Sequence, residues 1–198
     1  MNKFKKVLKK LSVLTTVAVM YVYAINSVVA ANDSAIYKID SFTGYLQEED
    51  AWCWVACAET SGKHLVSSSR NQSSAVTFVK GSRVNEGGTI REIAKAANYF
   101  TLDRYNYVGY NHAYSAAFLK GQIMSDRIPI LGMSYYESGY RTGGHATVAY
   151  MVTYNTDGTN GIGYYDTEDN RKYICSFEEF CDGSYNGWIY EETCYTNI

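Results

Sequence analysis

The pattern of hydrophobic and polar positions changes character at Pro129. Before it, three segments repeat apolar side chains at helical spacing, which predicts helices. These segments are 51–65, 89–99 and 114–124. After it, short runs rich in aromatic and β-branched residues lie between Gly-, Asn- and Asp-rich turns, which predicts strands. These runs are 128–136, 145–154, 161–167, 172–177 and 187–190. Helices followed by an antiparallel meander indicate an α+β fold in a single domain.

Two stretches give weaker signals. Residues 33–45 are mixed in character, and residues 67–88 are polar and rich in serine, so we expect a loop with one short element near 76–79. Asp50 precedes the first predicted helix and is a suitable N-cap, which would place Cys53 in the first turn.

The first 30 residues have the three parts of a secretory signal peptide. Five lysines lie within residues 3–10, an apolar run covers 11–24, and small residues at Val28 and Ala30 precede a cleavage site before Ala31. An uncleaved anchor over 11–30 is the alternative. Either interpretation places the domain, residues 31–198, outside the cytoplasm, and the lysine run favours a Gram-positive bacterium as the source.

Composition and charge exclude several classes of protein. Apolar residues make up 46% of the chain and charged residues 19%, enough to bury a core. Without residues 1–30, 13 basic residues face 20 acidic ones, so the domain carries a net charge of −7. We therefore expect no binding to nucleic acid, and no stable membrane association once the leader is removed.

The odd cysteine count constrains the thiol chemistry. All five cysteines follow the leader. In an oxidising compartment an odd number leaves at least one thiol free, so one free cysteine and two disulfides would satisfy the count. With Cys53 free, the pairing among Cys57, Cys175, Cys181 and Cys194 stays open, and a fully reduced chain is also compatible. A zinc site from Cys53, Cys57 and His64 is the metal alternative, although its spacing matches no common ligand pattern.

One ordered set of residues has the chemistry of an acyl-transfer site. A thiol at the start of a helix, Cys53, would be activated by the positive helix N-terminus. The strand that begins at His145 would bring a base, and the next strand would bring Asp166 to orient that base. Gln47 lies on the segment before the helix, where it could donate a hydrogen bond to an oxyanion.

These segments resemble papain-like cysteine peptidases, in particular the small secreted bacterial branch that includes staphopains and papain-like effectors. Residues 47–57 (QEEDAWCWVAC) resemble the family's nucleophile segment, and residues 129–132 (PILG) with 143–148 (GGHATV) resemble its histidine strand. Residues 164–166 (YYD) resemble the strand of the third catalytic residue.

The resemblance implies a papain-like fold, with the nucleophile helix packed against a C-terminal antiparallel sheet or half-barrel. It implies Cys53 as nucleophile, His145 as base, Asp166 as orienting group and Gln47 as oxyanion donor. Asn170 is a second candidate for the third position, because papain uses asparagine there. It also implies protein or peptide substrates and no cofactor. Only residues 31–46 would precede Gln47, too few for a papain-type propeptide, so control would fall to a separate inhibitor protein or to secretion.

Other functions are compatible with the same residues. The Cys53–His145 pair could cleave peptidoglycan cross-bridges as an amidase or endopeptidase. A toxin with one specific protein target is another possibility. A non-catalytic secreted binding protein could keep the papain-like fold, although this function would not explain the odd number of cysteines or the presence of Gln47.

Overall fold

The computed structural model describes residues 34–155 and 158–197. The leader and its cleavage site lie outside the described residues, so both stay predictions. Among the helices of the described part, none combines the length and the apolar character needed to span a bilayer.

The described helices lie mostly in the first half of this part of the chain. They are α2 (Cys53–Leu65), α3 (Gln72–Lys80), α4 (Ile90–Phe100), α5 (Ala116–Met124) and α6 (Phe177–Asp182). Helix α4 shows why they form: Thr89 caps it, its hydroxyl accepting from Glu92 N–H while the Glu92 carboxylate accepts from Thr89 N–H. Its apolar stripe, which includes Ile93 and Ala97, is buried.

The strands form a seven-stranded sheet in which every pairing is antiparallel. They are β1 (Ser34–Lys38), β2 (Asn106–Tyr110), β3 (Ile130–Glu137), β4 (Tyr140–Asn155), β5 (Gly161–Asp166), β6 (Arg171–Ser176) and β7 (Ile189–Asn197). The sheet order is β2-β7-β3-β4-β5-β6, and β1 pairs with the end of β4. The meander from β3 to β6 is therefore confirmed, with β7 returning to the other side of β3.

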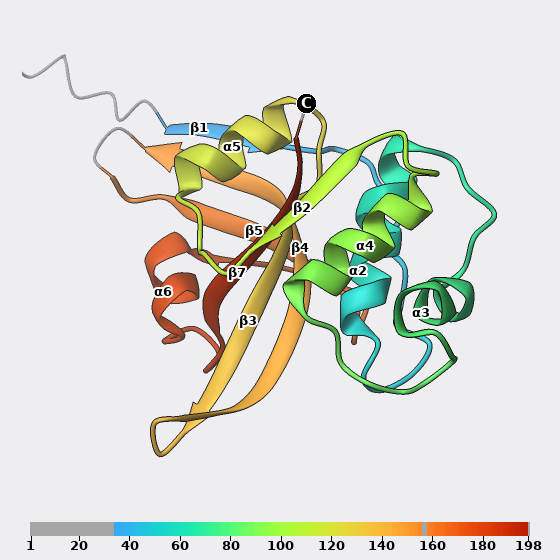
Figure 1. Cartoon of the computed structure of the whole chain (residues 1–198). Helices are drawn as coiled ribbons and strands as arrows, with labels where there is room; N and C mark the ends of the chain where they lie inside the picture. The colour runs from blue at the N-terminus through green and yellow to red at the C-terminus, as the bar shows by residue number, and fades with distance from the viewer. Residues whose placement is uncertain (1–33, 156–157, 198) are drawn as a thin grey trace, which may run out of the picture. The chain divides into compact units, whose positions relative to one another are not determined.

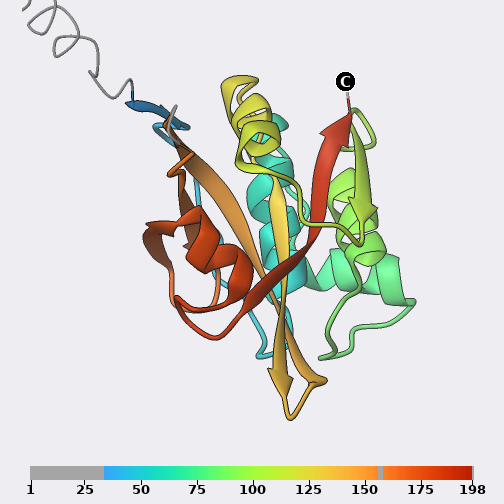
Figure 2. The same ribbon diagram turned by 90° about the vertical axis from the view of Figure 1, so that its left-hand side faces the viewer.

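The helices cover both faces of the sheet. Helices α2 and α4 pack against one face, and α6 packs on the opposite face beside β5, β6 and β7 (Figures 1 and 2). The core between α2 and the sheet contains Trp54, Val55 and Ala58 together with Val148 of β4, all less than 2% exposed. The α+β class, with the cysteine helix packed against an antiparallel sheet, is confirmed.

The helical part corrects two predictions. Helix α2 begins at Cys53, with Trp52 rather than Asp50 as the N-cap. Trp52 N–H donates to Glu49 O and closes a turn before the helix, which long-range hydrogen bonds hold in place: Ala51 N–H donates to Asn85 Oδ1, and Trp52 Nε1–H donates to Val84 O. The expected short element near 76–79 is a full helix, α3, which the Asn71–Ser74 capping box initiates.

The strands differ from prediction mainly at the ends of the chain. The mixed segment 33–45 contributes β1, and the connection before α5 contains β2. The predicted strand 187–190 overlaps only the first two residues of β7, which runs from Ile189 to Asn197 and pairs with both β2 and β3. Helix α6 was not predicted, because its six residues are too few to show helical periodicity.

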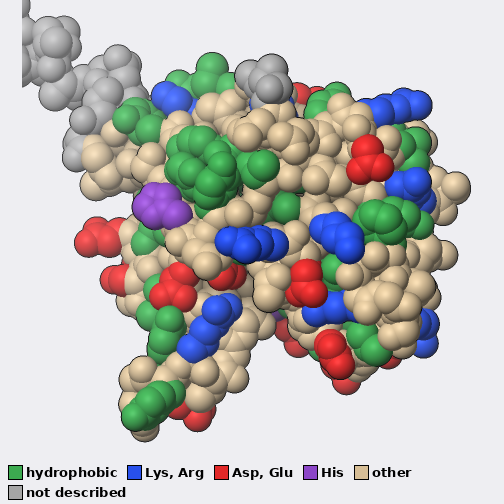
Figure 3. Space-filling model, viewed as in Figure 1, with side chains coloured by type: hydrophobic (Ala, Val, Ile, Leu, Met, Phe, Trp, Pro, Cys, Tyr) green, Lys and Arg blue, Asp and Glu red, His purple; other side chains and the backbone are tan. Residues whose placement is uncertain are grey.

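A long hairpin extends from the sheet. Strands β3 and β4 continue to the turn at Ser138–Gly139, where both residues have positive φ. Figure 3 shows this hairpin projecting beyond the rest of the domain with hydrophobic side chains near its tip. Tyr136 and Tyr140 flank this turn in the sequence and are 38% and 77% exposed. The base of the hairpin leads directly into His145.

Candidate active site

The site is built on the N-terminus of α2. Cys53 is the first residue of this helix, and Trp52 before it gives no side-chain cap. Backbone N–H groups in the first turn of a helix have no partner within the helix, and they create positive potential there. The Cys53 thiol, which is partly exposed, therefore lies where a developing anion is stabilised.

Strands β4 and β5 bring an imidazole and a carboxylate together. Asp166 lies opposite Thr147 on β4, and His145 is two residues from Thr147 and so on the same face. Such diagonal neighbours are within reach of long side chains. The His145 ring nitrogen Nε2 lies 3.0 and 2.9 Å from the two carboxylate oxygens of Asp166.

His145 and the Cys53 thiol line the same cleft. Because Nε2 faces Asp166, Nδ1 is the ring nitrogen left for the thiol. Burial alone would lower the pKa of His145, but the hydrogen bonds and charges of Asp166 and Cys53 outweigh it and raise the pKa to about 10. The imidazole is therefore protonated at neutral pH and presents a cation to the sulfur.

Gln47 lies beside the orienting strand. Its backbone N–H donates to the carbonyl of Thr167, the residue after Asp166, at 2.9 Å. Its side-chain Nε2 donates to Asp50 O at 3.0 Å, which fixes the amide and leaves the second hydrogen of that nitrogen for another acceptor. The amide oxygen is buried and has no hydrogen-bond partner within the described residues.

Asn170, the alternative to Asp166 as the group that orients His145, contacts a different side chain. Asn170 lies in the turn between β5 and β6 with a φ of +61°, and its Oδ1 accepts from the Tyr165 hydroxyl at 2.9 Å. His145 instead contacts Asp166. The Trp188 ring lies 5.6 Å from the His145 ring, centre to centre, and the His145 side chain is only 9% exposed.

A cleft of about 320 Å³ opens beside Cys53 and His145. One wall is the Gly87–Gly88–Thr89 turn, in which Gly88 packs against the Trp54 indole so closely that a Cβ would lie 2.4 Å from a ring carbon. Lys80 holds this turn by donating to Gly87 O at 3.0 Å and to Glu92 at 2.8 Å. Met133 and Ala146 of the sheet also line the cleft.

The predicted disulfides are not found, since all five cysteines are free thiols in the structure. Cys53 and Cys57 lie one turn apart on α2, and the fully buried Cys57 contacts the Thr167 hydroxyl, with Sγ and Oγ1 3.9 Å apart. Cys194 is fully buried within β7. Burial raises the pKa of Cys57, Cys175, Cys181 and Cys194, to about 11 for Cys175 and Cys181, so these thiols are weak nucleophiles at neutral pH.

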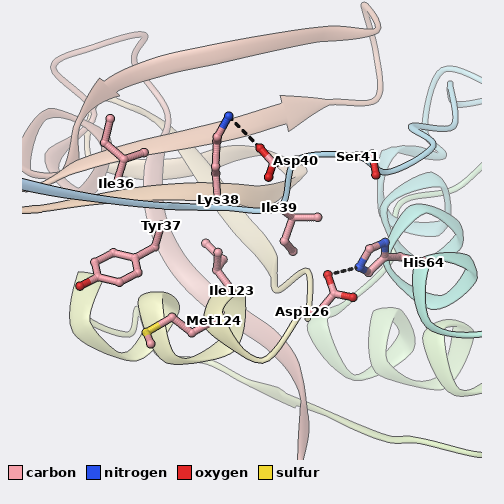
Figure 4. Close-up of a pocket in the computed structure, with 10 residues that line it drawn as sticks. All are labelled: Ile36, Tyr37, Lys38, Ile39, Asp40, Ser41, His64, Ile123, Met124 and Asp126. Atoms are coloured by element: carbon pink, nitrogen blue, oxygen red, sulfur yellow. Dashed lines mark hydrogen bonds and ion pairs between the residues drawn. The ribbon is translucent and has the colours of Figure 1, made fainter.

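The structure does not bring Cys53, Cys57 and His64 together as a zinc site. His64 lies near the far end of α2, about 16 Å along the helix from Cys53. Its Nε2 lies 2.9 Å from Asp126 Oδ1, and this pair lines a separate pocket of about 600 Å³ between α2, β1 and α5. Figure 4 shows His64 and Asp126 facing each other in that pocket.

A different donor set surrounds the imidazole itself. His145, Asp166 and the exposed Glu168 offer ligand atoms within 4.8 Å of one another, a spacing that a metal ion could bridge. However, Asp166 Oδ1 already accepts from Glu168 N–H at 2.9 Å, and both its oxygens face the His145 ring. The carboxylate is thus oriented toward the imidazole, as an acyl-transfer site requires.

Sequence reasoning missed the charged residues of the cleft. They are Lys80, Glu92, Arg141 and Glu192. Thr89-x-x-Glu92 is a recognisable capping box and could have located Glu92. No local sequence pattern indicated Glu192, because its position in the cleft depends on the pairing of the C-terminal strand β7 with β3.

No protein-family model matches the sequence, and no curated protein matches it. Among solved structures, a crystal structure of UfSP from C. elegans is similar to 81% of this chain, with a TM-score of 0.44 and 14% sequence identity. The similarity covers 33% of that chain, so this chain matches about a third of its length. The chemical interpretation of the site therefore rests on its own residues.

Proposed function

We propose that the protein is a papain-like cysteine peptidase that hydrolyses peptide bonds through a thioester on Cys53. The observation that carries the proposal is the position of His145, which is hydrogen-bonded to the Asp166 carboxylate and lines one cleft with the Cys53 thiol at a helix N-terminus. A nucleophile, a base and a group that orients the base are the required parts of such a site.

The arrangement accounts for each step of acyl transfer. The Cys53 thiolate, paired with the His145 imidazolium, attacks the carbonyl carbon of the substrate. The oxyanion is stabilised by the Cys53 backbone N–H and by the Gln47 side-chain amide. His145 then gives its proton to the leaving amine, so that the C–N bond breaks and a thioester remains. Water, deprotonated by His145, attacks the thioester, and the released thiolate completes the cycle.

Asp166 has a positioning role in this scheme. Its hydrogen bonds to Nε2 hold the ring so that Nδ1 points at sulfur, and its negative charge stabilises the imidazolium. Trp188 covers the same ring and keeps it from bulk water.

The location and substrates of the enzyme are part of the proposal. The leader pattern supports export, with the domain acting outside a Gram-positive cell on proteins or peptides and held in check by a separate inhibitor protein. N-terminal sequencing of the exported form tests the leader, with Ala31 as the expected first residue.

The proposed activity is tested by incubating the mature domain with unfolded protein substrates and, separately, with purified cell walls. We expect new peptide termini from the proteins, and loss of this cleavage in Cys53→Ala and in His145→Ala. Circular dichroism and thermal melting should show that both variants remain folded. Release of wall fragments with intact proteins would favour a peptidoglycan endopeptidase, and no cleavage of either would favour a binding protein.

A further inference from the structure

The cleft beside the Cys53 thiol contains two pairs of oppositely charged side chains that differ in the hydrogen bonds they make. Lys80 and Glu92 are 2.8 Å apart, and each makes further hydrogen bonds to the Gly87–Thr89 turn. In the second pair, Arg141 Nη2 and Glu192 Oε2 are 3.9 Å apart, beyond hydrogen-bond distance. Within the described residues, the Glu192 carboxylate has no hydrogen-bond donor.

The sheet holds Glu192 over the cleft. Glu192 lies opposite Gly132 on β3, and its side chain crosses that glycine, where a Cβ would lie 3.0 Å from Oε2. Strand β7 contains one extra residue here, Glu191, because the partners of Gly132 and Met133 are Glu192 and Tyr190. Such bulges redirect side chains and are frequent next to active sites. The Glu191 carboxylate is instead bound by the Tyr136 hydroxyl, at 2.9 Å.

The counter-charge is the more exposed partner of the pair. The Arg141 side chain is 47% exposed and belongs to the β3–β4 hairpin, whereas the Glu192 side chain is 18% exposed. An exposed guanidinium can turn into water at little cost, while a carboxylate in a cleft requires a cation or hydrogen-bond donors. A cationic group that entered the cleft could therefore replace Arg141.

We propose that Glu192 selects substrates with an arginine or lysine side chain close to the scissile bond. The apolar parts of Ile93, Met133 and Ala146 would pack against the methylene groups of that side chain, and its charge would reach the Glu192 carboxylate. This inference rests on the proposed function in one respect: it takes the cationic side chain in the cleft to be part of a peptide substrate.

The test uses neutral peptides through which a single arginine is moved, each paired with a peptide that has citrulline, its uncharged isostere, at the same place. For one position we expect kcat/KM to be about 10- to 100-fold higher with arginine, the range for a hydrogen bond to a charged group. In Glu192→Gln this ratio should fall toward one. In the matched control Glu191→Gln, which removes the neighbouring charge outside the cleft, the ratio should stay as in the wild type.

A binding measurement separates this inference from the peptidase itself. The same peptides are titrated into Cys53→Ala and into Cys53→Ala combined with Glu192→Gln. Tighter binding of the arginine peptide to the first protein, lost in the second, supports the acidic subsite even if no peptide is cleaved. Cleavage without arginine preference would support the peptidase and overturn the role of Glu192. An arginine preference that persists in Glu192→Gln would also overturn that role. So would equal binding of the two peptides, or no binding of either.

Discussion

His145 Nε2 lies 2.9 Å from Asp166 Oδ2, and this contact joins two neighbouring strands at the end of the cysteine helix. Because Asp166 occupies Nε2, the ring can meet the Cys53 thiol only through its other nitrogen. The contact thus determines both the orientation and the charge of the imidazole.

The first prediction concerns pH. The pKa of His145 is raised from 6.5 to about 10, so the stability that the protonated ring contributes is fully present below pH 6.5 and is lost as pH rises through about 10. The same deprotonation removes the acid that protonates the leaving amine. Urea unfolding and kcat measured between pH 6 and 11 should both decline on the alkaline side. A profile that stays flat through pH 10 in both would contradict the raised pKa.

The second prediction concerns the source of that shift. Asp166→Asn keeps an oxygen that can accept from Nε2–H but removes the negative charge, so the pKa of His145 should fall and the alkaline limb should move to lower pH. Asp166→Ala removes the orienting contact as well, and should lower kcat more than Asp166→Asn does. Equal pH profiles in the wild type and Asp166→Asn would show that Asp166 does not set the charge of the ring.

The third prediction concerns the wall of the cleft. A Cβ at Gly88 would lie 2.4 Å from Cδ2 of the buried Trp54, whereas a Cβ at Gly87 would meet nothing within 4 Å. Gly88→Ala should therefore destabilise the domain by about 1–3 kcal/mol in urea or thermal unfolding. Gly87→Ala is the matched control and should change stability less. Similar losses in the two variants would contradict the tight packing of this turn on Trp54.

The fourth prediction concerns the cover over the imidazole. Trp188→Ala would open the His145–Asp166 contact to water, which weakens a hydrogen bond, and should lower kcat about tenfold, equivalent to about 1.4 kcal/mol. Trp188→Phe keeps an aromatic ring there and should restore most of the rate. An unchanged kcat in Trp188→Ala, with the fold intact, would rule out a shielding role.

Helical periodicity predicted α4 and α5, because each of these helices buries one face. Runs of aromatic and β-branched residues between turns predicted the meander, whose strands β3, β4 and β5 are buried at consecutive positions. The polar helix α3 was predicted only as a short element near 76–79, although the Asn71–Ser74 capping box that begins it is present in the sequence. The start of α2 at Cys53 depends on contacts of the preceding turn with residues more than thirty positions away, which local pattern does not contain.

The site shows the same division. Cys53 begins α2 and Asp166 ends β5, where residue type and spacing indicate chemistry. The strand predicted to begin at His145 begins at Tyr140, so His145 lies within β4. Glu192 and Arg141 enter the cleft only through the pairing of β7 with β3 and the length of the hairpin, so sequence alone could not place them.

The most direct test of the central claim is mass spectrometry of the reduced, folded domain after brief exposure to an epoxide inhibitor of thiol peptidases. We predict one adduct, on Cys53, with the four buried or half-buried thiols unmodified and the adduct lost in His145→Ala. Absence of an adduct, modification mainly at another cysteine, or equal labelling of Cys53 without the imidazole would contradict an activated thiol at this site.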